Sequence, residues 1–351
     1  MAHFETDVAI VGAGPSGLFM VFEAGFMGYR SIVLDALPQV GGQLAALYPE
    51  KPIYDIPAHP SILAGELVEK LKVQAEAYAP HYLLGEPVLS LEGAPREFML
   101  RTASHVVAAK VIILAGGGGV FTPRKPTQLT NLETFEDSCA VLYAVTNKKA
   151  LAGKTVVLAG GGDSAVDWAV ELASMCAHVH VVHRRTDFRA AAATVQQMMD
   201  LAAAGKITLH TPTQLHELVG ENGILQRVIL ADNDEKLKEI NAERVVCCFG
   251  MAPNAGPLGS WGLGWDKGKV PVDRATMGTS RKGVLCIGDL ADYEGKVALI
   301  LTGFAEAAVA AKTCMSIIEP ERKFKVQYST SKGVPAVGAT GGAADAGAGV
   351  A

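Results

Sequence analysis

The stretch DVAIVGAGPSG, Asp7 to Gly17, decides the fold, because a short apolar run ends there in three closely spaced glycines. The Val- and Ile-rich run Asp7–Val11 is typical of a buried parallel strand. We expect a helix from about Ser16 to Gly28 and a second strand over Ser31–Leu34. Strand, glycine turn and helix in this order predict the first βαβ unit of a dinucleotide-binding domain.

The glycines of this turn have separate tasks. Gly12 permits the tight turn, Gly14 lets the backbone approach a diphosphate, and Gly17 lets the helix pack on the strand. The helix N-terminus near Ser16 then offers free N–H groups and the positive end of its dipole to the phosphates. Asp35 ends the second strand, where a carboxylate accepts hydrogen bonds from ribose hydroxyls. A tight turn without a ligand is the alternative, and it is disfavoured by the strand, the helix and the acid together.

The same pattern begins again at Lys154–Ala159, an apolar strand that leads into a second glycine turn. The strand that follows, His178–Val182, ends in a basic run instead of an acid. Guanidinium groups hold a ribose 2′-phosphate by bidentate hydrogen bonds, whereas an acid would repel it. This predicts NADPH rather than NADH, and a solvated basic strand end is the alternative. The residues concerned are Gly160, Gly162, Asp163 and Ser164 of the turn, and His183, Arg184, Arg185 and Arg189 of the basic run.

Two such beginnings predict an α/β protein with two doubly wound, Rossmann-like dinucleotide-binding domains. The late strand Val284–Ile287 suits the first domain better, so we expect the second domain to be inserted into the first. The expected limits are 1–117 with 250–330 for the first dinucleotide-binding domain and 118–249 for the second, the NADPH-binding domain. The Gly/Ala-rich residues 331–351 have little to pack and are expected to form a flexible tail.

The remaining segments give less specific patterns. Ser61 to Tyr78 has helical spacing, with Ser61 as the expected N-cap. Tyr82 to Ser104 divides into strand-length pieces, like a small antiparallel meander. A long helix is expected from about Val297 to Ile318, and Glu306 interrupts its apolar run, so no uncharged segment reaches membrane-spanning length.

Composition excludes several classes of partner. The net charge of −5 over 351 residues, with no long basic stretch, argues against nucleic acid. No signal-like segment opens the chain, and we expect a cytoplasmic enzyme with reduced cysteines and no membrane association. The six cysteines show neither a C-x-x-C pair nor metal-ligand spacing, so no metal is expected. They are Cys139, Cys176, Cys247, Cys248, Cys286 and Cys314.

The chain resembles the ferredoxin/flavodoxin–NADP reductases of the thioredoxin-reductase-like type, a bacterial homodimeric family, over all but its tail. The first and last of the motifs that carry the resemblance are specific to this reductase type, and thioredoxin reductases share the others. The motifs are GGQLAALYPEK (Gly41–Lys51), GGGDSAVDWA (Gly160–Ala169), HRRTDFRA (His183–Ala190), Gly288-Asp289, YEGK (Tyr293–Lys296) and YSTS (Tyr328–Ser331).

The resemblance implies FAD and NADPH as cofactors and ferredoxin or flavodoxin as the partner. NADPH would pass a hydride to flavin N5, and the reduced flavin would give single electrons to the carrier. Val88 is implied to meet the adenine through its backbone, and Asp289 to hold the ribityl chain. The other residues implied to contact or approach FAD are Ser16, Asp35, Gln43 and Phe121.

The flavin ring itself is implied to lie between two tyrosines. Tyr48 would stack on one face, Tyr328 would cover the other, and Thr330 would reach toward N5. In a dimer of this type, Tyr328 can reach the flavin of the partner subunit. Ala58-His59-Pro60 departs from the usual small–apolar–Pro pattern, and His59 is interpreted as a tolerated substitution.

Two other functions compete with this one. A disulfide reductase of the thioredoxin-reductase type is disfavoured because its C-x-x-C is missing and only Cys139 stands in the corresponding stretch. The adjacent Cys247 and Cys248 are interpreted as structural thiols of an apolar strand. A non-catalytic flavin and NADPH sensor is supported by no feature of the sequence and excluded by none.

Overall fold

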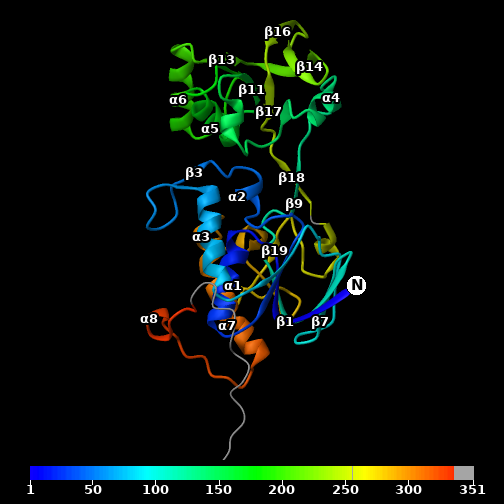
Figure 1. The fold of residues 1–351 in the computed structure, drawn as a ribbon, viewed down its shortest axis with the longest axis vertical. Coiled ribbons are helices and arrows are strands. Elements are labelled where there is room, and N and C mark those ends of the chain that lie inside the picture. Colours follow the sequence, from blue (N-terminus) through cyan, green and yellow to red (C-terminus); the bar gives the residue numbers. More distant parts are fainter. Residues whose placement is uncertain (255, 336–351) are drawn as a thin grey trace, which may run out of the picture. The chain divides into compact units, whose positions relative to one another are not determined.

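The computed structural model describes residues 1–254 and 256–335. The chain divides into two compact units, called unit 1 (Met1–Phe121 with Pro253–Ala351) and unit 2 (Thr122–Ala252) (Figure 1). Unit 2 is therefore an insertion in the chain of unit 1, in the predicted order. The chain passes between the units through β9 (Val120–Pro123) and β18 (Met251–Asn254), which pair with each other.

Unit 1 is built on a mainly parallel sheet. Its parallel strands are β1 (Ala2–Val11), β2 (Ser31–Asp35), β5 (His81–Leu84), β8 (His105–Leu114) and β20 (Val284–Cys286). They lie in the order β5-β2-β1-β8-β20, and β6 (Ser90–Glu92) and β7 (Phe98–Arg101) continue antiparallel from the first half of β8. Because β20 pairs with β8, the late strand joins the first domain, as predicted from the sequence.

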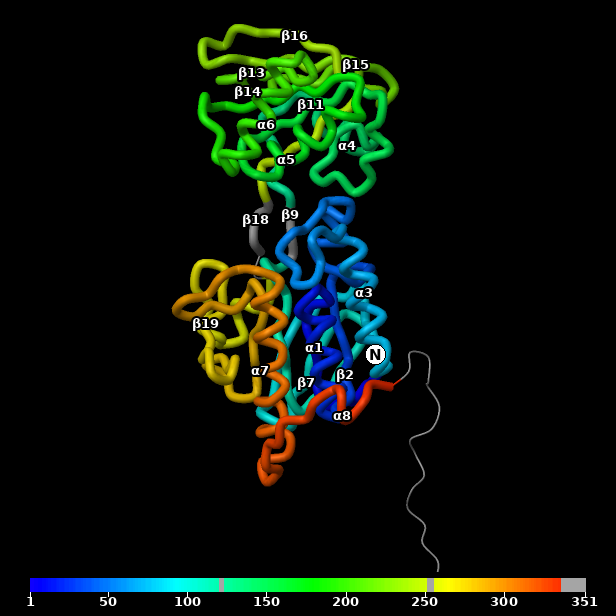
Figure 2. Tube along the Cα trace, turned by 90° about the vertical axis from the view of Figure 1, so that its left-hand side faces the viewer, coloured from blue at the N-terminus to red at the C-terminus, as the bar shows by residue number. Residues whose placement is uncertain are grey.

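Three long helices cover one face of this sheet: α1 (Pro15–Phe26), α3 (Ala64–Glu76) and α7 (Ile300–Ile318). The helices α1 and α7 run beside each other (Figure 2). By length and composition α7 passes for a membrane span, yet its buried side chains belong to the core of unit 1. The opposite face of the sheet packs against Trp261, Leu263 and Leu290.

Short elements complete unit 1. They are α2 (Gln43–Ala46), β3 (Pro52–Ile53), β4 (Ile62–Leu63), η2 (Gly256–Ser260), β19 (Val270–Pro271), η3 (Gly288–Leu290), β21 (Ala291–Asp292) and α8 (Ser329–Lys332).

Three local predictions for unit 1 were wrong. The helix α3 begins at Ala64 with no side-chain cap, because Ile62–Leu63 pairs with Pro52–Ile53 instead of letting Ser61 cap the helix. Residues Tyr82 to Leu84 belong to the parallel strand β5, so the meander is limited to β6, β7 and β8. Part of the expected flexible tail is helical: Lys332 of α8 donates a hydrogen bond to the carbonyl oxygen of Phe26. Residues 336–351 lie outside the described part of the chain.

Unit 2 repeats the doubly wound plan. A parallel sheet has the order β10 (Val141–Leu142), β17 (Arg244–Cys247), β11 (Thr155–Ala159), β12 (His178–Val182) and β13 (Ile207–His210). An antiparallel sheet follows, formed by β14 (Thr213–Glu221), β15 (Ile224–Asp232) and β16 (Leu237–Asn241). The helical segments are α4 (Leu132–Asp137), η1 (Lys148–Leu151), α5 (Asp163–Leu172) and α6 (Ala192–Ala203).

A row of histidines on the parallel sheet of unit 2 meets Lys238 of the antiparallel sheet. His180 Nδ1 lies 3.1 Å from His210 Nε2, and Lys238 Nζ lies 3.5 Å from His210 Nδ1. Because an ammonium group can only donate, His210 accepts at Nδ1 and donates from Nε2 to His180. Burial is the largest cause that lowers the pKa of both rings, to about 4, and the charges of Lys238 and His178 add to it.

Acid should therefore weaken unit 2. A histidine whose folded pKa lies below its unfolded value of 6.5 stabilises the fold fully above that value and loses this contribution as pH falls toward about 4. Calorimetric unfolding between about pH 7 and about pH 4.5 should show this loss, and His210→Gln should reduce the slope by about one proton. A variant that keeps the wild-type slope would place the acid sensitivity elsewhere.

Candidate functional site

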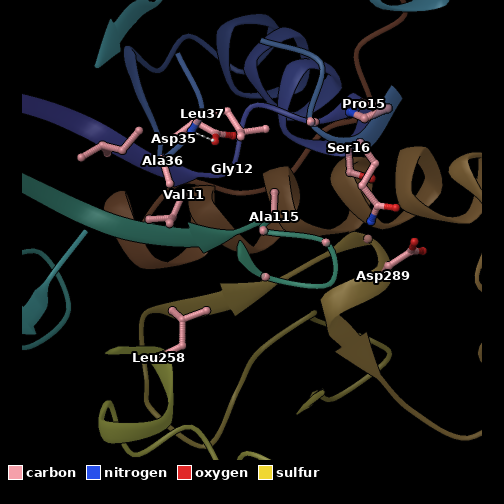
Figure 3. Close-up of a pocket in the computed structure, with 18 of the residues that line it drawn as sticks. Val11, Gly12, Pro15, Ser16, Asp35, Ala36, Leu37, Ala115, Leu258 and Asp289 are labelled. Atoms are coloured by element: carbon pink, nitrogen blue, oxygen red, sulfur yellow. Dashed lines mark hydrogen bonds between the residues drawn. The ribbon is translucent and has the colours of Figure 1, made fainter. Parts of the chain in front are cut away.

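A cavity of about 230 Å³ lies in unit 1 where the parallel strands β1, β2 and β8 end (Figure 3). The glycine turn, the end of β2, the start of α2 and the segment after β20 all contribute to its wall. The structure thus brings together at one site most of the residues expected to hold FAD. Those lining the cavity are Gly12, Gly14, Ser16, Asp35, Gln43, Tyr48, Val88 and Asp289. The side chain of Phe121 lies outside the described residues.

The glycine turn leaves space for a ligand at one position only. Gly12 has φ +115°, and a methyl group on it would lie 2.3 Å from the carbonyl oxygen of Ala115. A methyl group on Gly17 would lie 2.0 Å from the carbonyl oxygen of Gly12. One on Gly14 would meet nothing within 4 Å, although Gly14 lines the cavity. Packing therefore requires Gly12 and Gly17, whereas Gly14 keeps open a cradle that fits a diphosphate.

Asp35 ties the end of β2 to the glycine turn. Its Oδ2 accepts from the Ala13 N–H at 2.6 Å. Its Oδ1 accepts from the Leu37 N–H at 2.8 Å, and Figure 3 shows these two residues side by side. Burial raises the pKa of Asp35, and the two backbone hydrogen bonds act against that rise. Each carboxylate oxygen keeps a lone pair after these bonds, so the group can also accept from the hydroxyls of a ribose.

Tyr48 and Asp289 mark the other part of the cavity wall. Tyr48 belongs to the loop after α2, and Asp289 belongs to the turn η3 that follows β20. Burial raises the pKa of Tyr48, and the charge of Asp289 raises it further. Tyr48 therefore stays a neutral phenol near neutral pH, and it offers a half-buried ring as a wall for a planar ligand.

Helix α7 contributes residues that sequence reasoning did not place at the site. Ile300 lines the cavity, and Gly303 lets α1 come close, because a methyl group there would lie 2.1 Å from Ser16 Oγ. One turn further, Glu306 is buried and accepts from the Gly288 N–H at 2.7 Å. The signal for it in the sequence is a single carboxylate within an apolar helix, which by itself argues only against a membrane span.

In unit 2, the loop that follows β12 packs against one side of the second glycine turn. Gly161 has no room for a methyl group, because the His183 ring would lie 2.2 Å from it. The Arg189 N–H donates to the Gly161 carbonyl oxygen at 2.8 Å, and Asp163 Oδ1 accepts from the Ala191 N–H at 2.9 Å. Gly162, at the start of α5, has open space around it. The loop is therefore held beside a turn that is free to receive a phosphate.

The predicted basic run lies on this loop. Arg184, Arg185 and Arg189 are exposed, and their side chains pair with no residue of the described ranges 1–254 and 256–335. His183 is buried, and burial, followed by the charges of the arginines, lowers its pKa. The loop thus carries three exposed guanidinium groups and a buried, neutral imidazole, which suits an anion such as a phosphate ester. Ser164 is exposed on the first turn of α5.

Tyr328 and Thr330 are not brought to the cavity of their own chain. Tyr328 precedes α8 and its surface is 67% exposed. Lys332 lies 4.8 Å from the centre of the Phe26 ring, at the C-terminal end of α1. The glycine turn is at the opposite end of that helix, about 18 Å away at a rise of 1.5 Å per residue. In this structure neither residue lines the cavity of its own chain.

Two glycine turns, each between a parallel strand and a helix, are typical of a protein with two dinucleotide sites. Residues 6–313 match the family of pyridine nucleotide-disulphide oxidoreductases, and the chain belongs to that family.

Individual relatives are similar to this chain over most of their own length. The chain is 48% identical over 331 residues to the ferredoxin–NADP reductase of Acidiphilium cryptum, covering 94% of this chain and 97% of the relative. It is 46% identical over 332 residues to that of Granulibacter bethesdensis, covering 94% and 95%. Among solved structures, T. acidophilum thioredoxin reductase superimposes with a TM-score of 0.74 at 25% identity, covering 89% of this chain and 98% of that one.

The glycine turn of unit 1 allows a matched test. Gly14→Ala adds a methyl group to open space at an ordinary φ of −71°, so the fold should unfold within about 2 °C of wild type, while affinity for the predicted FAD falls about tenfold. Gly17→Ala forces the methyl group into a carbonyl oxygen and should lower stability by about 1–3 kcal/mol or more. Thermal unfolding and flavin titration of the apo-protein would measure both. Equal behaviour of the two variants would contradict the division of roles.

Proposed function

We propose that the protein is a ferredoxin–NADP reductase, which transfers hydride between NADPH and FAD and exchanges single electrons with ferredoxin or flavodoxin. The observation that carries this proposal is the cavity of unit 1, whose open glycine, ribose-facing acid and tyrosine wall fit FAD. The curated relatives quoted above, similar over almost their whole length, bear the name of this activity.

FAD would be held in unit 1 from end to end. The turn at Gly14 and the N-terminus of α1 would bind the diphosphate, and Asp35 the ribose of the adenosine. Val88 lines the cavity and would face the adenine, while Gln43, Tyr48 and Asp289 would bind the flavin part. Bound FAD supplies a hydride acceptor at N5 and can release its electrons one at a time, which lets a two-electron donor serve a one-electron carrier.

NADPH would bind to unit 2. Gly162 and the N-terminus of α5 would take its diphosphate, and the three exposed arginines its 2′-phosphate. No acid, base or nucleophile of the protein is needed for the hydride step, so the task of these residues is to bind and orient. The FAD-binding domain would span residues 1–117 with 250–330, and the NADPH-binding domain residues 118–249.

The disulfide-reductase alternative finds little support in the thiols. All six cysteines are free. Cys139 is exposed but has no nearby partner in sequence, and burial raises the pKa of Cys247 far above its ordinary value. A buried thiol with a raised pKa is a poor nucleophile. The third alternative, a flavin sensor, is separated from the reductase by the assay below.

The assembly and its location belong to the same proposal. We propose a homodimer, because Tyr328 and Thr330 lie too far from the cavity of their own chain to act there. The dimer places Tyr328 of one chain over the flavin of the other. In this proposal the dimer is a cytoplasmic, bacterial protein, and its partner is a soluble ferredoxin or flavodoxin.

One assay separates the three functions. NADPH should bleach the flavin of the purified protein, and cytochrome c should then be reduced only when ferredoxin or flavodoxin is added. Reduction of a disulfide substrate without the carrier would favour the disulfide reductase. Bleaching without turnover with either carrier would favour the sensor.

Arg184→Ala combined with Arg185→Ala should remove most of the preference for NADPH. The wild type should prefer NADPH over NADH by about tenfold or more in kcat/KM, since each charge-assisted hydrogen bond to the phosphate contributes about 1.5–3 kcal/mol. Steady-state kinetics with both nucleotides would measure the change, and activity with NADH serves as the internal control. A double variant that still strongly prefers NADPH would place the 2′-phosphate site elsewhere.

Tyr328→Ala should change access to the flavin. A tyrosine stacked on the ring excludes water and occupies the place of the nicotinamide, so its removal should alter the flavin absorption band and the stopped-flow rate of reduction by NADPH. Affinity for FAD should stay within about threefold, because the cavity of the same chain is untouched. Truncation after Lys332 is the matched control and should change none of these. An unchanged spectrum with unchanged kinetics would place Tyr328 away from the ring.

A further inference from the structure

A buried charge pair lies directly behind the turn that carries Asp289. The side chain of Glu306 is 3% exposed and that of Lys296 is 8% exposed, and the two form an ion pair. Glu306 Oε1 also accepts from the Tyr293 hydroxyl at 2.7 Å. Charged side chains are rarely buried to this degree unless they are paired.

What the pair holds is the backbone of the turn. Glu306 Oε2 accepts from the Gly288 N–H at 2.7 Å, and Lys296 Nζ donates to the Gly288 carbonyl oxygen at 3.0 Å. Gly288 has φ +71°, a conformation that favours glycine. The pair therefore holds both backbone polar groups of one glycine residue, and a third contact, from Lys269 to the Asp289 carbonyl oxygen, follows one residue later.

The turn that this ion pair holds is part of the cavity wall. Gly288 and Asp289 both line it, and so does Ile300, which lies on α7 before Glu306. Gly303, between them on the helix, packs against Ser16 of the glycine turn. Helix α7 thus connects the two turns of the site, touching one through Gly303 and the other through Glu306.

We propose that Glu306, together with Lys296, is a positioning residue of the flavin site: it holds the Gly288–Asp289 turn so that Asp289 meets the bound flavin. The inference rests on the proposed function, because the ligand in question is FAD. Glu306 does not line the cavity, and its carboxylate oxygens bond Gly288, Tyr293 and Lys296.

The alternative is a pair that only stabilises the fold, and charge-free variants separate the two roles. Replacing both partners of a buried ion pair by uncharged residues of similar size is often harmless to stability, whereas removing one partner leaves an unpaired charge. In Lys296→Met with Glu306→Gln, the amide oxygen can still accept from the Gly288 N–H. In Lys296→Met with Glu306→Leu, that N–H loses its acceptor.

The experiment titrates FAD into the apo-forms of both full-length double variants and follows flavin fluorescence. The Gln variant should bind FAD within about threefold of wild type, and the Leu variant at least about tenfold more weakly, the loss expected for one buried hydrogen bond. Amide exchange in the peptide that contains Gly288 should rise in the Leu variant alone. Lys110→Met, which removes a lysine paired with Asp7 at 2.8 Å in the same unit, is the matched control and should leave the affinity unchanged.

The outcomes are separable. Equal FAD affinity and equal Gly288 exchange in the two double variants would overturn the positioning role. Wild-type apo-protein that binds no FAD would instead overturn the proposed function. If the Leu variant does not fold, Glu306→Asp keeps the charge but withdraws the carboxylate from Gly288. It should then weaken FAD binding, and wild-type affinity in that variant would equally reject the proposal.

Discussion

The contact on which unit 1 depends is the approach of helix α1 to the strand before it, where the Cα of Gly17 lies against the carbonyl oxygen of Gly12. No side chain fits there, since even a methyl group would lie 2.0 Å from that oxygen. The close approach directs the first N–H groups of α1 at the cavity. It also leaves the end of β2 near enough for Asp35 to bond the Ala13 N–H. The packing of the helix on the sheet and the shape of the cavity therefore both depend on the absence of a side chain at Gly17.

Of the two tight backbone contacts in the turn of unit 1, unit 2 keeps only the one at its first glycine, because Ala165 stands where unit 1 has Gly17. Gly160 lies against Cys248 of the neighbouring strand end, and Gly161 against the His183 ring. In unit 1 the next strand ends in an acid bound to the turn, whereas in unit 2 it ends in exposed arginines held beside the turn by backbone bonds. Both units have a parallel strand, a glycine turn and a helix in the same order. The sign of the charge at the end of the next strand therefore distinguishes the two predicted ligands.

The parts of this arrangement that depend on near neighbours could be read from the sequence. Both glycine turns, the strands that flank them and the order of the insertion have local patterns that the structure repeats. The parts that depend on distant pairing could not. Ser61 resembles an N-cap until Pro52–Ile53 pairs with the residues after it. Glu306 shows no local reason for its burial, because its partners come from Gly288, Tyr293 and Lys296 on a separate segment.

The pairing of β9 with β18 gives unit 2 the properties of an exchangeable cassette. Its first and last residues leave through adjacent strands, one strand spacing or about 4.8 Å apart. A segment whose ends are neighbours can be gained, lost or replaced without moving the ends of the host chain. Nucleotide preference could thus change in evolution by exchange of the inserted segment, while the flavin-binding part of the chain kept its sequence and its core.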